Sequence, residues 1–189
     1  MPSTVIQWFP GHMAKTRRMM KECLPEVDIV IELLDARIPY SSKNPEIEKI
    51  IANKSRIYIL NKQDLADPEI TAEWIKYFKS KGTGAIALNS KTGKNFGSVK
   101  AQIDKELKEL LERRQNRGIE GVKIRAMLCG IPNVGKSTFI NGFAGEQRAK
   151  AADKPGVTRG KQWITVDNFE SSLIRPDDKG DFALEFEGS

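Results

Sequence analysis

Short apolar runs alternate along the chain with longer segments in which apolar residues return every three or four positions. The runs have the length and β-branched composition of buried strands, whereas the longer segments have the period of helices that cover a sheet. The expected strands are residues 27–35, 56–60, 85–88, 122–129 and 162–166, and the expected helices are residues 12–24, 46–52, 69–79, 96–113 and 136–144. This alternation predicts an α/β protein with a doubly wound, mainly parallel sheet.

Length and composition indicate one globular domain with extensions. The chain has 189 residues, of which 39% are hydrophobic and 30% charged, and it lacks the run of about 18 apolar residues that a membrane span needs. We expect a basic arm over residues 1–24, a domain over residues 25–166, an acidic tail over residues 167–189, and a cytoplasmic location. Two cysteines and a single histidine, His12, predict neither a disulfide framework nor a His-based metal centre.

Charge is distributed unevenly between the tail and the rest of the chain. Residues 167–189 contain seven acidic and two basic side chains, a net charge of −5, whereas the whole chain carries +6, which leaves about +11 on residues 1–166. Such a basic body favours a polyanionic partner, most simply nucleic acid, because phosphate contacts dominate that kind of affinity. The alternative is a solvated surface whose lysines only aid solubility.

The motif GIPNVGKS at residues 130–137 has the spacing of a phosphate-binding loop, directly after an expected strand and at the start of an expected helix. In such a loop, backbone N–H groups and the helix N-terminus surround the β-phosphate. Lys136 supplies a point charge and the Ser137 hydroxyl binds Mg²⁺. The predicted nucleotide-binding residues here are Asn133, Val134, Gly135, Lys136, Ser137 and Thr138.

A second motif, NKQD at residues 61–64, follows another expected strand. The Asp64 carboxylate suits guanine, because it can accept hydrogen bonds from N1–H and the 2-amino group, and adenine offers neither donor. Asn61 is expected to brace the neighbouring loop and Lys62 to lie along the base plane. Asn89, Ser90 and Lys91 suit a third loop that contacts the guanine oxygen. An alternative function is that of a P-loop enzyme that uses ATP, but Asp64 argues against it.

These motifs resemble those of translation-factor-type GTPases, but the guanine reader precedes the phosphate loop, which is the order of circularly permuted GTPases. The segments QWFPGHMAK (7–15), DARIP (35–39) and GIPNVGKST (130–138) resemble, more narrowly, the ribosome biogenesis GTPase A family, also called YlqF. The resemblance implies a three-layer P-loop GTPase fold. It also implies a cytoplasmic, monomeric enzyme that hydrolyses GTP to GDP and assists late assembly of the large (50S) ribosomal subunit, in contact with its rRNA.

The same resemblance implies roles for single residues. Thr158, in PGVT at residues 155–158, matches the first switch and would bind Mg²⁺ together with Ser137. His12 is a candidate for orienting the attacking water, with RNA contact or packing as its other readings. An asparagine at the position of Asn133 often accompanies K⁺-dependent activity. The expected catalytic residues are therefore His12, Lys136 and Thr158.

The chain departs from the family pattern after residue 166, because no strand ending in the second-switch motif is evident. After residue 166, the only Asp-x-x-Gly candidate is residues 177–180, preceded by Pro176, which is unfavourable in a buried strand. Without that strand the phosphate-loop strand would have an exposed edge unless residues 172–174 or 182–186 pair with it. The alternative function is consequently a hydrolytically impaired, guanine-nucleotide-dependent module that docks on RNA or the ribosome.

Overall fold

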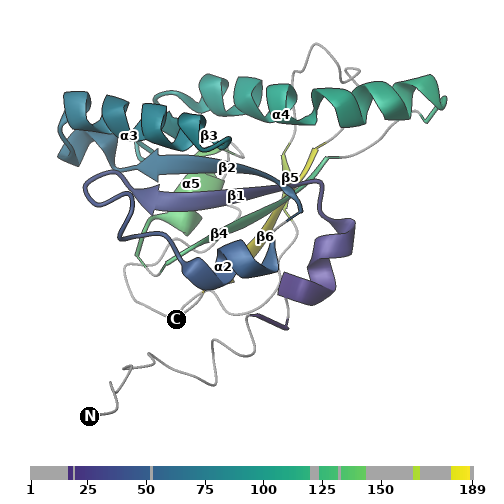
Figure 1. Ribbon diagram of the computed structural model, residues 1–189, viewed down its shortest axis with the longest axis horizontal. Coiled ribbons are helices and arrows are strands. Elements are labelled where there is room, and N and C mark those ends of the chain that lie inside the picture. The colour runs from purple at the N-terminus through teal and green to yellow at the C-terminus, as the bar shows by residue number, and fades with distance from the viewer. Residues whose placement is uncertain are drawn as a thin grey trace.

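The described strands form one sheet in the order β3-β2-β1-β4-β6-β5 (Figure 1). The computed structural model describes residues 17–18, 20–51, 53–119, 124–131, 133–143, 164–166 and 180–187. Neighbouring strands are parallel from β3 to β6, and β5 pairs antiparallel with β6. The strands are β1 (Ile29–Asp35), β2 (Ser55–Asn61), β3 (Gly84–Ala87), β4 (Arg125–Gly130), β5 (Ile164–Val166) and β6 (Gly180–Glu187).

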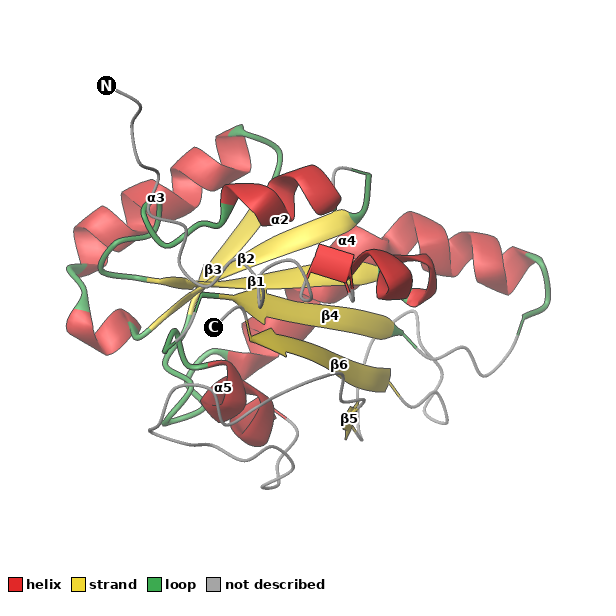
Figure 2. Cartoon of the chain, turned by 90° about the horizontal axis from the view of Figure 1, so that it is seen from below, coloured by secondary structure: helices red, strands yellow, loops and turns green. Residues whose placement is uncertain are grey.

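Helices cover both faces of the sheet, which gives three layers. Figure 2 shows α2 and α3 on one side of the sheet and α5 on the other. The apolar face of α4 packs with α5 and with one face of β1 and β2, whereas α2 and α3 pack against the opposite face. The helices are α2 (Pro45–Ile50), α3 (Pro68–Ser80), α4 (Phe96–Asn116) and α5 (Lys136–Phe143), with short 3-10 turns η1 (Leu24–Glu26) and η2 (Gln63–Leu65).

The central strand β1 explains why the sheet is buried on both faces. All seven of its residues are buried, as expected for a parallel strand between two helical layers. Ile29, Ile31 and Leu33 face α4 and α5, and Val30 and Leu34 face the other layer. The predicted α/β class and doubly wound sheet are confirmed. Those ends of the expected elements that lie within the described residues agree with the structure to within about three residues. Of the expected helix at residues 12–24, the described residues 17–18 and 20–23 are helical.

Helix ends follow local chemistry. Asp67 caps α3 by accepting hydrogen bonds from the backbone of Glu69 and Ile70 at 2.9 and 3.0 Å, and Pro68 occupies the first helical position. The helix α4 ends at Asn116, two residues before Gly118, whose φ of +67° suits a glycine. None of the helices in the described ranges is long and apolar enough to cross a membrane.

Strand β6 pairs with the edge of β4, the phosphate-loop strand. The sequence offered two segments for this position, residues 172–174 and residues 182–186. Its backbone pairs with β4 from Asp181 beside Arg125 to Glu187 beside Gly130, so residues 182–186 supply the neighbour that the phosphate-loop strand needs. The sheet therefore includes part of the segment that the sequence sets apart as an acidic tail.

Of the Asp-x-x-Gly candidate at residues 177–180, only Gly180 lies in the described part of the structure, and its position argues against a role as the second switch. Gly180 begins β6 and lies at the end of the sheet near Arg125, whereas the phosphate loop follows Gly130 at the other end of β4. Five residues of parallel strand span about 16 Å. A switch motif must reach the γ-phosphate beside the phosphate loop. The start of β6 lies at the opposite end of the strands, too far away for that contact.

Candidate functional site

The candidate site lies where four parallel strands end. Chain order reverses at β1, since β2 and β3 follow on one side and β4 lies on the other. Ligands bind outside the carboxyl ends of strands at such a switch point. Asp35 ends β1, Asn61 ends β2, Ser90 follows β3, and Gly130 ends β4. The sequence motifs at residues 61–64, 89–91 and 130–137 therefore meet at one edge of the sheet.

The phosphate loop has the backbone conformation that its glycines permit. Gly135 has a φ of +99°, and a Cβ there would lie 2.4 Å from Asn61 Nδ2, so both strain and contact exclude a larger residue. Asn133 is also left-handed, with a φ of +62°. The Phe139 amide donates to the Gly135 carbonyl at 2.9 Å and closes the first turn of α5. The loop thus leads its amides directly into a helix N-terminus.

Lys136 is buried at the start of α5, and its ammonium group binds the loop itself. Its Nζ donates to the carbonyl oxygens of Gly130 and Ile131 at 2.9 and 3.1 Å. Neutral carbonyls are weaker acceptors for an ammonium group than a phosphate oxygen. The arrangement therefore holds a cation within the loop, where an anionic ligand can replace the two carbonyls.

Asn61 links the three loops of the site. Its Nδ2 donates to the Val134 carbonyl at 2.9 Å, and its Oδ1 accepts from Ser90 N and Ser90 Oγ at 3.1 and 2.7 Å. Asn61 and Ser90 are both buried. Asn61 does brace the neighbouring loop, and it braces the third loop as well.

Lys62 connects the same loop to the end of β1. Its Nζ donates to the Asn133 carbonyl at 2.7 Å and lies 3.8 Å from Asp35 Oδ2. Asp35 also accepts hydrogen bonds from Arg37 Nε at 3.0 Å and Arg37 Nη2 at 2.7 Å. The Arg37 guanidinium therefore lowers the pKa of Asp35, against the opposing effect of burial. This carboxylate stays charged and holds Lys62 beside the phosphate loop.

Asp64 lies in the 3-10 turn η2 and is exposed, so its carboxylate is accessible from solvent. The turn is tied to the third loop because the Gln63 amide donates to the Leu88 carbonyl at 3.1 Å. In that loop, Asn89 Oδ1 accepts from the Lys91 amide at 3.1 Å, a local turn that leaves the Lys91 side chain exposed.

Other predicted site residues are described in part or not at all. Thr138 is half-buried in α5, and Ser137 lies in its first turn, although the Ser137 side chain is outside the described part of the structure. His12 and Thr158 both lie outside the described residues. The donor chemistry at the start of α5 fits Mg²⁺, which prefers hard oxygen ligands such as a serine hydroxyl beside phosphate oxygens.

Two acidic residues at this edge received no role from the sequence. Asp35 belongs to the motif at residues 35–39, and an acid at the end of a buried strand is the signal that could identify it. Glu187 was assigned to the tail, and backbone pairing places it beside Gly130. A local pattern could not reveal the second residue, because only the register of β6 defines its position.

Comparisons with known proteins agree with the motifs. The family described as 50S ribosome-binding GTPase matches residues 125–178. Ribosome biogenesis GTPase A of Priestia megaterium is 51% identical over 172 residues, which cover 90% of this chain and 60% of that protein. The protein of the same name from Bacillus cereus is 51% identical over 162 residues, covering 86% of this chain and 55% of that protein.

The fold is also that of a solved structure. GNP-bound YlqF from Thermotoga maritima superposes with a TM-score of 0.56 at 24% sequence identity, over 93% of this chain and 60% of that one. The sequence matches confirm the resemblance to the ribosome biogenesis GTPase A family, and the superposition confirms the P-loop GTPase fold. The chain spans between about half and two thirds of the length of these curated relatives.

Proposed function

We propose that this chain, a relative of the ribosome biogenesis GTPase A proteins, binds GTP at the carboxyl edge of its sheet and hydrolyses it during assembly of the large ribosomal subunit. The observation that carries the proposal is the convergence of three loops on Asn61. A base reader, a third loop and a phosphate loop held by one side chain form a single nucleotide site. The names of the relatives favour hydrolysis over a purely docking module.

Each loop contributes a distinct part of nucleotide binding. The backbone amides of residues 133–137 would surround the β-phosphate at the N-terminus of α5, and the Lys136 ammonium group would neutralise its charge. Asp64 would select guanine through two hydrogen bonds, with Lys62 along the base plane. Asn89, Ser90 and Lys91 would border the base from the third loop. Asn61 keeps these groups in register and so reduces the ordering cost of binding.

Hydrolysis would draw on residues from the N-terminal arm and from the segment that follows β4. Ser137 and Thr158 would hold Mg²⁺, which supplies charge stabilisation to the phosphate oxygens when bound. Asn133, exposed beside Lys62, is the residue through which K⁺ would act. His12 would orient the attacking water. These assignments follow from the family resemblance, and the working protein would be a cytoplasmic monomer with residues 1–24 as a basic arm that contacts rRNA.

The deciding experiment is GTP turnover by the full chain at saturating nucleotide, in K⁺ and in Na⁺ buffer, with and without large ribosomal subunits. Turnover that rises with subunits supports the proposal. Guanine-selective binding without turnover under any of these conditions would overturn the hydrolytic part and leave a docking module.

Two variants test the site itself. We expect Lys136→Ala to weaken GTP binding by about 100-fold or more, because a charge-assisted contact to phosphate is lost. We expect Asp64→Asn to move the base preference from guanine to xanthine. Lys108→Ala and Glu112→Gln, at exposed positions of α4, are the matched controls. Unchanged affinity in Lys136→Ala would refute the phosphate-loop assignment.

A further inference from the structure

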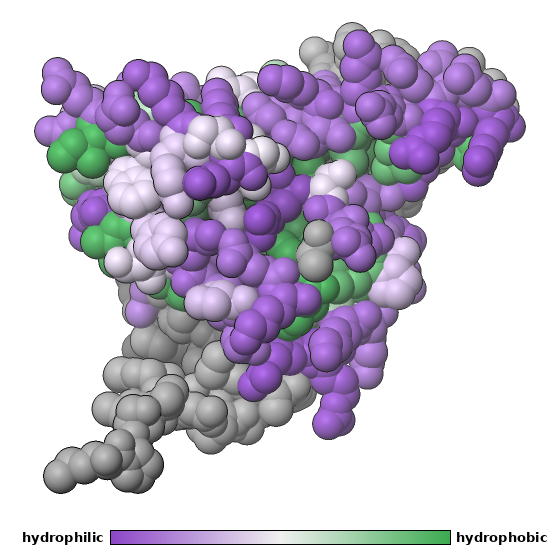
Figure 3. Space-filling model, viewed as in Figure 1, coloured by the Kyte–Doolittle hydropathy of each residue, from purple (hydrophilic) through white to green (hydrophobic). Residues whose placement is uncertain are grey.

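An open groove of about 510 Å³ lies beside α3 and is lined by Tyr40, Ile70, Glu73, Trp74 and Tyr77. Its walls are mostly apolar, yet Tyr40 and Ile70 are each 59% exposed and Tyr77 is 40% exposed. Figure 3 shows white and green side chains gathered at the left of the molecule, over α3 and beneath it. Clustered exposed aromatic residues of this kind mark interaction surfaces. We call this feature the α3 groove.

The rings of the α3 groove are held in place by one another and by the core. Trp74 stacks on Tyr40 with centroids 6.2 Å apart and meets Tyr77 edge-on at 5.5 Å. It also stacks on Phe78 at 5.9 Å, and Phe78 is buried. Rings that are already ordered lose little conformational entropy on binding, so such a surface is preorganised for a ligand.

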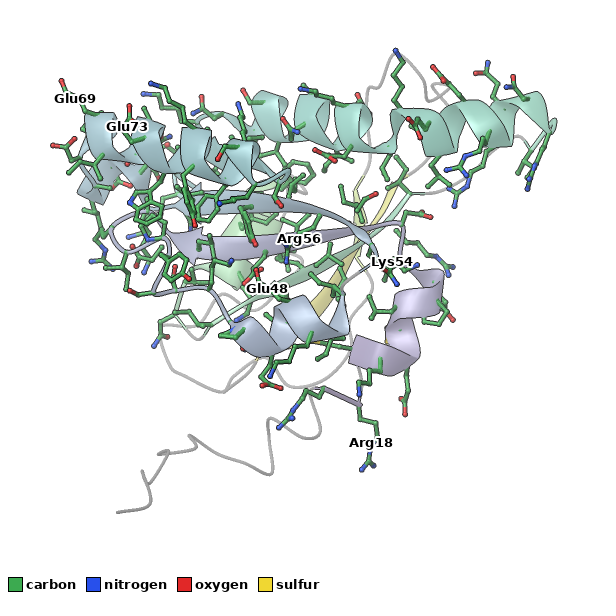
Figure 4. All side chains as sticks on the ribbon, in the orientation of Figure 1. Arg18, Glu48, Lys54, Arg56, Glu69 and Glu73 are labelled. Atoms are coloured by element: carbon green, nitrogen blue, oxygen red, sulfur yellow. The ribbon has the colours of Figure 1, made fainter. Side chains whose placement is uncertain are left out.

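Acidic side chains gather at the N-terminal end of α3, although the chain as a whole carries a net charge of +6. Every charged residue between residues 64 and 75 is acidic, namely Asp64, Asp67, Glu69 and Glu73, and the basic residues Lys76, Lys79 and Lys81 follow toward the C-terminal end. Figure 4 shows Glu69 and Glu73 pointing outward from the same end of α3. The Glu73 side chain is 72% exposed and forms a surface ion pair with Lys76, of a kind that contributes little and exchanges easily.

Two tyrosine rings of the groove already have ammonium groups near their faces. Lys43 Nζ lies 5.6 Å from the Tyr40 ring centroid, and Lys81 Nζ lies 5.6 Å from that of Tyr77. Lys43 is also bound to Glu48 at 2.6 Å, so its charge is largely compensated. The electron-rich rings therefore suit cationic groups, and guanidinium groups stack on them especially well.

We propose that the α3 groove docks a basic segment of a partner protein, in which an apolar or aromatic side chain enters the groove and flanking lysine or arginine side chains meet Glu69 and Glu73. RNA fits less well, because its phosphates would lie against these carboxylates. The inference does not depend on GTP hydrolysis, because none of the groove residues belongs to the nucleotide site.

The test is fluorescence anisotropy of the full chain with labelled ten-residue peptides. One peptide alternates lysine and arginine with leucine and tryptophan, a second replaces its basic residues by glutamate, and a third replaces its apolar residues by serine. Single-stranded RNA of the same length is a fourth probe. We expect saturable binding of the first peptide only. The proposal would be overturned if the RNA or either altered peptide bound as tightly as the first peptide or more tightly. It would also be overturned if none of the probes bound.

Variants locate the binding site. We expect Glu73→Lys and Tyr77→Ala each to weaken binding of the first peptide by about tenfold, since one reverses a complementary charge and the other removes a wall of the groove. Glu112→Lys and Ile119→Ala, exposed on and just after α4, make the same kinds of change elsewhere and should alter affinity by less than about twofold. Circular dichroism and GTP binding, measured on the same samples, separate loss of docking from loss of fold or of the nucleotide site. Equal effects in test and control variants would refute the location.

Discussion

Asn61 makes three side-chain hydrogen bonds, one to the Val134 carbonyl of the phosphate loop and two to Ser90 of the third loop. A buried hydrogen bond contributes about 1 kcal/mol net, and more is lost when its partner stays buried and unpaired. Gly135 is required opposite it, because a Cβ there would lie 2.4 Å from Asn61 Nδ2. The asparagine and the glycine are thus a matched pair from segments 74 positions apart in the sequence.

Glu32 is a second residue whose environment sets its behaviour. It lies on β1 with its side chain buried, its Oε1 accepts from the Asn44 amide at 3.3 Å, and its Oε2 is an unsatisfied buried atom within the described structure. Burial raises the pKa of Glu32 from 4.5 to about 7, although the Asn44 amide, Arg56 and Lys43 act in the opposite direction. Glu48, bound to Lys43, adds to the increase.

This carboxyl group predicts a pH dependence of stability. Between about pH 4.5 and 7 the unfolded chain loses the Glu32 proton while the folded chain keeps it, so the contribution of Glu32 to the free energy of unfolding falls as pH rises through this window. Over this window the free energy of unfolding falls by about 3 kcal/mol because of Glu32.

We expect Glu32→Gln to remove this contribution to the pH dependence of stability and to be more stable than the original chain at pH 8. Urea unfolding from pH 5 to 8 checks this, with Glu109→Gln on the exposed face of α4 as the control. Parallel pH curves for Glu32→Gln and the original chain would contradict it.

At the scale of elements, α5 carries the phosphate loop and must be fixed to the sheet. It is anchored by an aromatic cluster in which Phe139 stacks on Phe143 with centroids 5.3 Å apart and meets Phe96 of α4 at 5.8 Å. Phe139 is fully buried. The position of Lys136 therefore depends on packing three residues further along the same helix.

We expect Phe139→Ala to lower the free energy of unfolding by about 3–5 kcal/mol, because it removes a large buried ring and leaves a cavity. Nucleotide affinity should also fall, because α5 loses the packing contacts that hold it in place. Urea unfolding and nucleotide binding, measured together, check this. Leu65→Ala, at a residue 59% exposed, should change stability by less than about 0.5 kcal/mol. A Phe139→Ala chain as stable as this control would show that the cluster does not anchor α5.

At the scale of the whole molecule, β6 covers the edge of β4 and so completes the sheet beside the phosphate loop. We expect deletion of residues 180–189 to expose that edge, which would speed hydrogen exchange of the β4 amides and cause self-association. Deletion of residues 188–189 alone keeps β6 and should have neither effect. Hydrogen exchange and light scattering on both truncated chains measure this. Slow exchange at β4 in the longer deletion would mean that β6 does not protect it.

Periodicity and motif spacing were sufficient to predict the α/β class, most helices and strands, and the three motif loops that meet at one edge of the sheet. These features are local: apolar periodicity reports which face is buried, and glycine and lysine at fixed spacing report a phosphate loop. Residues 29–35, 61–64 and 130–137 each carry their signal within a few positions.

Tertiary structure alone decided how those segments meet. The contact of Asn61 with both Val134 and Ser90, the approach of Lys62 to Asp35, and the buried setting of Glu32 arise from strand order and register, which a linear pattern does not encode. The position of β6 is also a result of long-range pairing. The composition of these residues indicated a tail, but their backbone pairs with β4, and the start of β6 lies at the end of β4 that is far from the phosphate loop. The sequence by itself determined which local structures and chemical groups are present, because side-chain periodicity and loop geometry act over a few residues. Long-range packing determined which groups share a site, because only the folded sheet brings distant strand ends to one edge.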